Sequence, residues 1–365
     1  MNNIKITTLT PTHVGSGEKP LREVDFLFFE QEGKVAMLDP EKVLDIIGVG
    51  QVDQWVACVS NQEGLAELLN QRKRDLRAED VALRVLPVQH KGLGRKGDIH
   101  EQLHDGMGRP LLPGSSLKGA VRTVLFAHYI NQNGGEDAKD RQNLLDRRKV
   151  FSDALLSKKY FGNDPNHDVL RLLRLGDATF DETVCAKVET INLKGNDWIV
   201  DARFTQFTEV IPEGETTTFA LQFDSTTEKN ARLKNYFTND TSVLQPPKLF
   251  EIINRHTRDL AQREAKAWRK QTSTADCIDH YIERLDEIVA ATLQCGPQEC
   301  ILRLGWGTGF RNMTGDWHIH MTDDDYYELV RKLRSRHPEY MIYPKSCRLL
   351  ADGTPLGFVK LSKQQ

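Results

Sequence analysis

The stretch from Leu112 to Arg122, LPGSSLKGAVR, decides how the middle of the chain folds. It opens with a Pro-Gly turn signal, and Ser115 or Ser116 is suited to cap a following helix, because a hydroxyl oxygen accepts a free backbone N–H there. The apolar residues beyond the turn repeat at helical spacing: Leu117, Val121, Val124 and Leu125. The stretch therefore predicts a helix over about 115–131 with one buried face.

The start of this helix has the chemistry of an anion site. Lys118 and Arg122 are four residues apart and share a second face of the helix. Free N–H groups and the positive end of the helix dipole attract phosphate at such a start. The spacing is not that of a Walker phosphate loop, which needs Gly-x4-Gly-Lys-Ser/Thr. An ordinary capped helix with solvated charges is the alternative.

Two further glycine-bearing runs stand near the two ends of the chain. They are LTPTHVGSG at 9–17 and RLGWGTGFR at 303–311. Gly15 and Gly17 lack a Cβ, so the backbone there can approach a sugar–phosphate chain closely and present N–H groups to it. In the second run we expect Trp306 to be a core residue and Arg311 to be the contact residue.

In this order, the three runs resemble the RAMP superfamily of CRISPR RNA-binding proteins. Their sequences are most similar to those of the subunit that caps the 3′ end of the guide RNA in type III-A (Csm) effector complexes. The likeness spans 4–311 and a final PLGFV at 355–359, whereas about 130–300 carries no matching motif.

That resemblance implies ferredoxin-like, RNA-recognition-like modules with antiparallel sheets and a helical insertion. It also implies guide RNA and the backbone and other Csm subunits as partners. A role in maturation of the guide (crRNA) for antiviral defence follows from it, with a housekeeping nuclease trimming the 3′ end. The expected RNA contacts are His13, Gly15, Gly17, Arg95, Lys96, Ser115, Ser116, Lys118, Arg122 and Arg311.

Composition sets the broad class of the protein. With 365 residues, 39% hydrophobic and 28% charged, the chain fits a soluble globular protein of about two structural units. The N-terminus has no apolar signal core, and the six cysteines are scattered, which favours a cytoplasmic protein with reduced thiols. A net charge of −3 argues against a non-specific duplex DNA binder but allows a local basic patch, such as the glycine-rich loop at 89–99.

The order of expected elements indicates an α+β protein with antiparallel sheets. Strands are expected at 2–10, in a hairpin at 24–38 and between 170 and 224, with a polar loop at 226–243. A helical block at 248–292 precedes strands at 301–304 and 356–361. The domains expected are an N-terminal RAMP domain at 1–225, a helix-rich region at 226–300 and a β-rich segment at 301–365 that completes a second RAMP-like module.

Two enzymatic alternatives stand beside the binding role. His13 lies in a turn and imidazole titrates near neutrality, so a RAMP endoribonuclease that processes CRISPR repeat RNA is one alternative. The run His100-Glu-Gln-Leu-His104 matches the His-Glu-x-x-His pattern of zinc hydrolases, although glycines before it and Pro110 after it disfavour the long helix that this motif needs. We expect no catalytic residue, no metal and no cofactor.

Overall fold

The fold is that of a computed structural model, and the described residues are 2–89, 98–132, 154–195, 197–233, 240–271, 276–316 and 344–364, with 324, 327–328 and 330–331. Most of the loop expected at 89–99, including Arg95 and Lys96, lies outside these residues. No single described helix is long and apolar enough to span a membrane, and residues 40–47 and 49–61 reach that length only as a pair bent by 91°.

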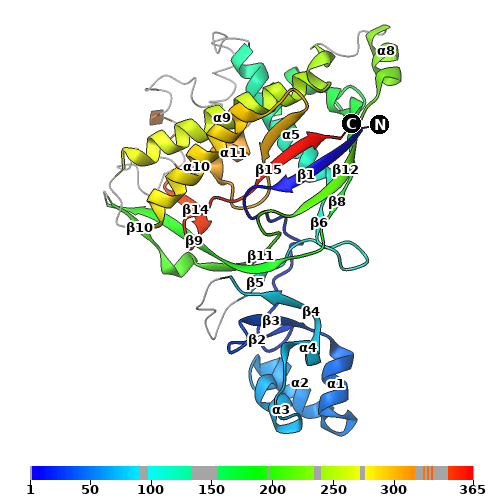
Figure 1. Ribbon diagram of the computed structural model, residues 1–365, viewed down its shortest axis with the longest axis vertical. Helices are drawn as coiled ribbons and strands as arrows, with labels where there is room; N and C mark the ends of the chain where they lie inside the picture. The colour runs from blue at the N-terminus through cyan, green and yellow to red at the C-terminus, as the bar shows by residue number, and fades with distance from the viewer. Residues whose placement is uncertain are drawn as a thin grey trace.

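A five-stranded antiparallel sheet forms the centre of the body (Figure 1). Its strand order is β13 (Glu299–Arg303), β15 (Phe358–Lys363), β1 (Asn2–Thr8), β12 (Thr216–Phe223) and β7 (Leu173–Leu175). In β1, Ile4 and Ile6 are fully buried and alternate with more exposed residues, as a strand with one covered face requires.

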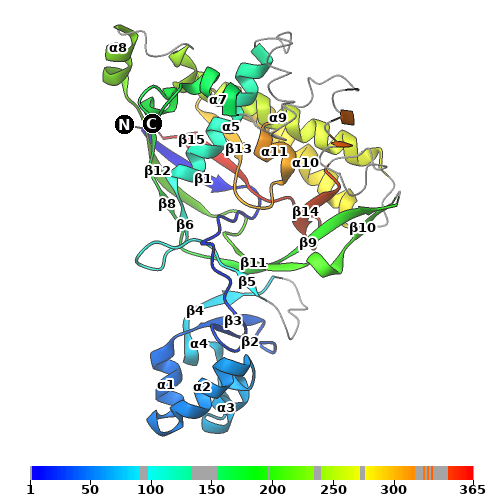
Figure 2. The same cartoon turned by 180° about the vertical axis from the view of Figure 1, so that it is seen from behind.

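Helices α5 (Gly114–Gln132) and α9 (Lys248–Arg269) pack side by side on that sheet, as Figure 2 shows. Their apolar residues join Ile4, Ile6 and Leu302 in one core cluster. A third helix, α10 (Cys277–Gln294), packs along α9. Helices on one face of an antiparallel sheet confirm the expected α+β class.

The second sheet continues the body below the first. Its order is β10 (Asp197–Val200), β9 (Val184–Lys194), β11 (Gln206–Val210) and β5 (Ile99–His100), and β14 (Ser346–Leu350) also pairs with β9. Only β5 and β11 run parallel among these pairs. Bridges from Thr12 to Ile211 and from Gly15 to Gln102 tie the first glycine-bearing run to this sheet.

A small lobe projects from the body at one end (Figures 1 and 2). Its sheet consists of β2 (Phe26–Phe29), β3 (Lys34–Leu38) and β4 (Ala82–Pro87), which confirms the expected hairpin. The lobe has its own core, built from residues such as Val43, Leu65, Leu69 and Val81. The helices that cover its sheet are α1 (Pro40–Ile47), α2 (Val52–Asn61), α3 (Leu65–Arg72) and α4 (Ala78–Val81).

The remaining elements are short. They are β6 (Leu111–Leu112), β8 (Ala178–Thr179), α7 (Ala154–Phe161), α8 (Ser225–Leu233), α11 (Gly309–Thr314) and the 3-10 turns at 49–51, 169–172, 202–204 and 241–244. The polar loop expected at 226–243 is therefore wrong in part. Asp224 accepts the backbone N–H of Thr227 and starts α8, and Val243 and Leu244 of the last turn are buried.

The two ends of the chain meet in the central sheet. β13 and β15, from the segment expected to complete a second module, pair with each other, and β15 pairs with β1. β13 and β15 thus extend the sheet that the N-terminus begins, whereas β14 joins the second sheet. The expected domain limits at 225 and 300 stay a prediction.

Candidate nucleic-acid interface

The three glycine-bearing runs meet at one cleft of about 440 Å³ between α5, α11 and the N-terminal turn. The first run contributes Val14 and Gly15, and the third contributes 303–306 and Thr308, followed by Asn312 and Met313 just beyond it. The middle run supplies one side of α5: Ser116, Gly119, Ala120, Thr123 and Val124. Sequence segments almost 300 residues apart therefore line one surface.

His13 anchors the N-terminal turn to β11. Its Nδ1–H donates to the carbonyl oxygen of Glu209, with 2.7 Å between the heavy atoms, and the side chain is almost fully buried. Burial lowers the pKa of His13 to about 4, so the ring is neutral at pH 7. The N–H of Val14 donates to Oε1 of Gln102 at 3.0 Å, which fixes the next residue of the turn.

Trp306 stands at the join between the first and third runs. Its backbone N–H donates to the carbonyl oxygen of His13 at 2.9 Å. Its ring stacks on His100, with centroids 5.6 Å apart, and the guanidinium of Arg348 lies 5.1 Å from its centroid. The expectation of a core tryptophan is wrong in part, because Trp306 is only half-buried and lines the cleft.

Arg303 supports the third run from within the core. Its guanidinium pairs with Glu264 at 2.9 Å, donates to the carbonyl oxygen of Leu356 and lies over the ring of Phe358. The side chain is 2% exposed, so the ion pair is shielded from solvent. Because this buried charge has partners in three directions, it fixes the end of β13 from which the third glycine-bearing run begins.

The predicted serine cap of α5 is wrong. The helix begins at Gly114, so Ser115 and Ser116 lie in its first turn. The carboxylate of Asp177 takes the N–H of Gly114 at 2.7 Å, and an anion at a helix start is favourable. Asp177 is 63 residues away in sequence, which is why the local pattern did not reveal it.

The two predicted cations of α5 lie on a different side from the cleft. Arg122 pairs with Asp168 at 2.7 Å, donates to Ser157 and lies 4.0 Å from the centroid of Phe161. Lys118 makes no ion pair within the described part of the chain, and burial lowers its pKa. The spacing of four residues does place Lys118 and Arg122 together, but Ser116 and Gly119 are the ones that line the cleft.

The other predicted contacts differ in their surroundings. Gly15 lines the cleft, whereas Gly17 has a φ of +93° and open space around it. Ser115 is exposed. Arg311 is half-buried on α11, with no ion pair to the residues that the structure describes.

The His-Glu-x-x-His run does not form a helix. His100 ends β5, and its ring stacks on Trp306, whereas Nε2 of His104 lies 3.3 Å from Oε1 of Glu209. Residues four apart in an extended chain are separated by about 13 Å, so the two imidazoles are not presented together as on a helix.

A different titratable cluster adjoins the N-terminal turn, where Oγ of Ser16 donates to Glu101 at 3.0 Å. Glu101, His104 and Glu209 each place one potential metal ligand within 4.8 Å of the others. The guanidinium of Arg84 already lies 2.6 Å from Glu101 and 3.1 Å from Glu209. Burial opposes ionisation of Glu209, but a hydrogen bond with His104 and the charge of Arg84 lower its pKa below the usual range. The sequence marks Arg84 only as one of several basic residues, and its pairing with Glu209 was missed because no local pattern links β4 to β11.

Comparison with known proteins finds relatives of this chain. A curated relative from Methanocaldococcus jannaschii, named CRISPR system Cms protein Csm5, is 24% identical over 354 residues, 91% of this chain and 77% of the relative. A Streptococcus thermophilus protein of the same name is 28% identical over 163 residues, 39% of this chain and 44% of the relative.

Two solved structures share the fold. One is a chain of a Csm–crRNA–target RNA ternary complex of a type III-A CRISPR-Cas system, with a TM-score of 0.76 and 20% identity, covering 99% of this chain and 100% of that one. The other is Csm5 of T. onnurineus, with a TM-score of 0.68 and 22% identity, covering 97% and 99%. The model of the RAMP superfamily matches residues 5–312, which include all three glycine-bearing runs, and the chain belongs to that superfamily.

Proposed function

We propose that this chain is a subunit of a cytoplasmic type III-A Csm effector complex, in which it binds guide RNA and caps its 3′ end. In this role it holds the end of the guide while a separate nuclease trims it, and it contacts the backbone and other Csm subunits. The likeness to proteins named Csm5 supports membership of such a complex.

The observation that carries the RNA-binding role is the convergence of the three glycine-bearing runs on one cleft. Gly15 and Gly305 leave backbone exposed along its wall, and Ser116 and Thr123 offer hydroxyl groups from α5. Single-stranded RNA is held by such close backbone approach together with cations and ring systems. Arg348 and Arg311 place positive charge near this wall, over Trp306 and on α11.

We also propose that the subunit does not cut RNA. His13 is the residue on which the ribonuclease alternative depends, and it is 2% exposed with its Nδ1–H engaged by Glu209. A general acid or base must reach the proton that it transfers. Purified protein should therefore leave CRISPR repeat RNA intact. A defined cut that His13→Asn abolishes without weakening RNA binding would establish the ribonuclease instead.

Gly119 offers a sharp test of the cleft. It is exposed on α5, and a Cβ built there meets nothing within 4 Å, so several side chains fit without disturbing the core. Gly119→Ala keeps the cleft open, whereas Gly119→Glu brings a carboxylate to it and Gly119→Lys brings a cation of similar length. All three residues are better helix formers than glycine, so the variants should fold.

Binding of a labelled guide RNA 3′ segment is then measured by fluorescence anisotropy. We expect Gly119→Glu to bind about tenfold more weakly than Gly119→Ala, because a carboxylate repels phosphate. Gly119→Lys should bind at least as tightly as Gly119→Ala. Equal affinity of the Glu and Ala variants would show that RNA does not occupy this cleft.

A further inference from the structure

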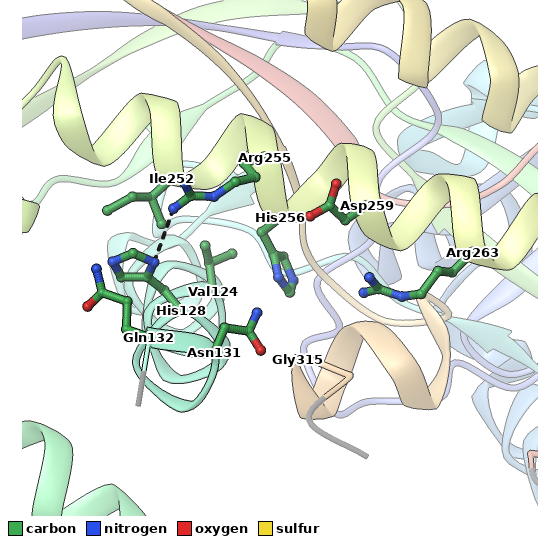
Figure 3. A pocket seen from close by; sticks show the side chains of 10 residues that line it. All are labelled: Val124, His128, Asn131, Gln132, Ile252, Arg255, His256, Asp259, Arg263 and Gly315. Carbon is green, nitrogen blue, oxygen red and sulfur yellow. Dashed lines mark hydrogen bonds between the residues drawn. The ribbon is translucent and has the colours of Figure 1, made fainter. Parts of the chain in front are cut away.

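A second, smaller pocket of about 270 Å³ lies between α5 and α9, next to the cleft (Figure 3). The cleft and this α5–α9 pocket share Val124 and His256 as common walls. Pockets for drug-sized ligands hold roughly 300–1,000 Å³, so this one suits a single small group and not a folded strand. Besides His256, the polar side chains that line it are His128, Asn131, Gln132, Arg255, Asp259 and Arg263.

His128 presents a fixed donor in this pocket. Nη2 of Arg255 donates to its Nδ1 at 3.2 Å, and a guanidinium cannot accept, so Nδ1 carries no proton. Burial, with the charge of Arg255, lowers the pKa of His128 to about 4, so at pH 7 its one proton is on Nε2. That Nε2–H is buried and has no partner among the described residues, and the side chain is only 8% exposed.

His256 points from α9 toward α5, between Arg255 and Arg263, as Figure 3 shows. Its Nε2 is also buried without a hydrogen-bond partner in the described structure. A buried polar atom that makes no hydrogen bond destabilises the fold. Two such nitrogens lining one pocket indicate that a ligand with polar edges completes it.

The charges argue against phosphate as that ligand. Arg263 is held by Asp316 at 2.8 Å, and Asp259 stands on the same helix face as Arg255. Two guanidiniums are thus set against two carboxylates, and both histidines are neutral because burial lowers their pKa to about 4. A site with no net charge, apolar walls from Val124 and Ile252, and both donors and acceptors suits a neutral heterocycle better than an anion.

We propose that the α5–α9 pocket takes one splayed-out nucleobase of an RNA strand that runs through the neighbouring cleft. This inference rests on the proposed RNA-binding function. A base of single-stranded RNA can be turned out and read by hydrogen bonds on its edge. Here His128 and Gln132 supply donors, Asp259 supplies an acceptor, and the ring of His256 and Val124 form walls.

The test combines protein variants with abasic RNA. Oligonucleotides of about six nucleotides, within the site sizes of single-strand binding folds, are made with one abasic position at a time. An abasic nucleotide removes the base and keeps the phosphate. We expect one position at which the abasic change weakens binding to the wild-type chain about tenfold, as the loss of a pair of hydrogen bonds predicts.

Two protein variants are combined with the same abasic oligonucleotides to test whether the pocket holds the sensitive base. His256→Phe keeps a ring and removes its nitrogens, and Asp259→Asn removes the charge from a half-buried acceptor. In both variants, the abasic change at the sensitive position should weaken binding much less than it does in the wild type. Asp279→Asn, the same change at an exposed site on α10, is the matched control and should behave as the wild type.

The outcomes separate the two proposals. If the intact oligonucleotide does not bind, the RNA-binding function and the base pocket both fail. If it binds but no abasic position matters, or the effect is equal in wild type and variants, only the base pocket is overturned. A methylphosphonate linkage can also replace one charged phosphate of the RNA. If its effect on binding differs between the wild type and Asp259→Asn, while the abasic effect does not, the pocket holds a phosphate and the base assignment is wrong.

Discussion

Gly305 faces the carbonyl oxygen of His13 so closely that a Cβ at position 305 would lie 2.4 Å from it. This approach is what brings the third glycine-bearing run against the first and lets Trp306 bond to the same carbonyl. Gly305 also has a φ of +90°, a region that side chains rarely adopt. The join at the base of the cleft therefore depends on glycine for two separate reasons.

We predict that Gly305→Ala destabilises the protein by more than 2 kcal/mol, because the strained φ adds to the clash with His13. Gly309→Ala is the matched control. Gly309 has a φ of +83°, but a Cβ there would have nothing within 4 Å. Gly309→Ala should therefore lower the free energy of unfolding by only about 1 kcal/mol. Urea denaturation of both variants measures the difference. Equal losses would mean that the close approach to His13 contributes nothing.

The buried imidazole of His13 predicts a pH dependence of stability. Its pKa is about 4 in the folded protein and about 6.5 in the unfolded chain, so between these values the unfolded state binds more protons. The contribution of the neutral His13 ring to the free energy of unfolding is complete above pH 6.5. It is lost as the pH falls toward 4, at about 1.4 kcal/mol per pH unit. His13→Asn should reduce the slope of unfolding free energy against pH by that amount. An unchanged slope would contradict burial of the neutral ring.

Lys118 and Arg122 should behave differently despite their shared helix face. Arg122→Ala removes the pair with Asp168, the bond to Ser157 and the contact with Phe161, so we expect a loss of about 1–3 kcal/mol in stability. Lys118→Ala should leave stability nearly unchanged.

If Lys118 contacts an RNA phosphate, its loss should lower the slope of log affinity against log salt by about 1. Arg72→Ala, on the exposed surface of the lobe, is the matched charge control. A salt slope that changes equally in both variants would remove Lys118 from the RNA contacts.

The Arg84 cluster predicts a conditional metal site. In the wild-type chain the guanidinium already pairs with both Glu101 and Glu209 and occupies the place that a cation would take, so added zinc should leave the melting temperature unchanged. Arg84→Met should destabilise the fold, because it leaves the buried Glu209 unpaired, and zinc should then restore part of the loss. Adding His104→Ala should abolish that rescue. One tightly bound zinc in the wild-type chain would refute this account.

Much of the secondary structure follows from local pattern. Alternation in β1, the hairpin of β2 and β3, and the helical repeat from Leu117 to Leu125 are each recognisable within a few residues, because strand and helix periods bury one face. The order of these elements also indicates the α+β class. Where local pattern failed, at α8 and at the cap of α5, the deciding contacts were an Asp side chain before the helix and a partner 63 residues away.

The sequence by itself determined which segments have special backbones: the glycine-bearing runs around Gly15, Gly114 and Gly305. Only the tertiary structure decided that they share one cleft, and that Lys118 and Arg122 lie outside it. The pairing of Arg84 with the buried Glu209 and the buried nitrogens of His128 and His256, which lack hydrogen-bond partners among the described residues, also arise from elements distant in sequence. Burial and partner geometry, which set the charge and hydrogen bonding of these groups, depend on packing between elements and leave no trace in local spacing.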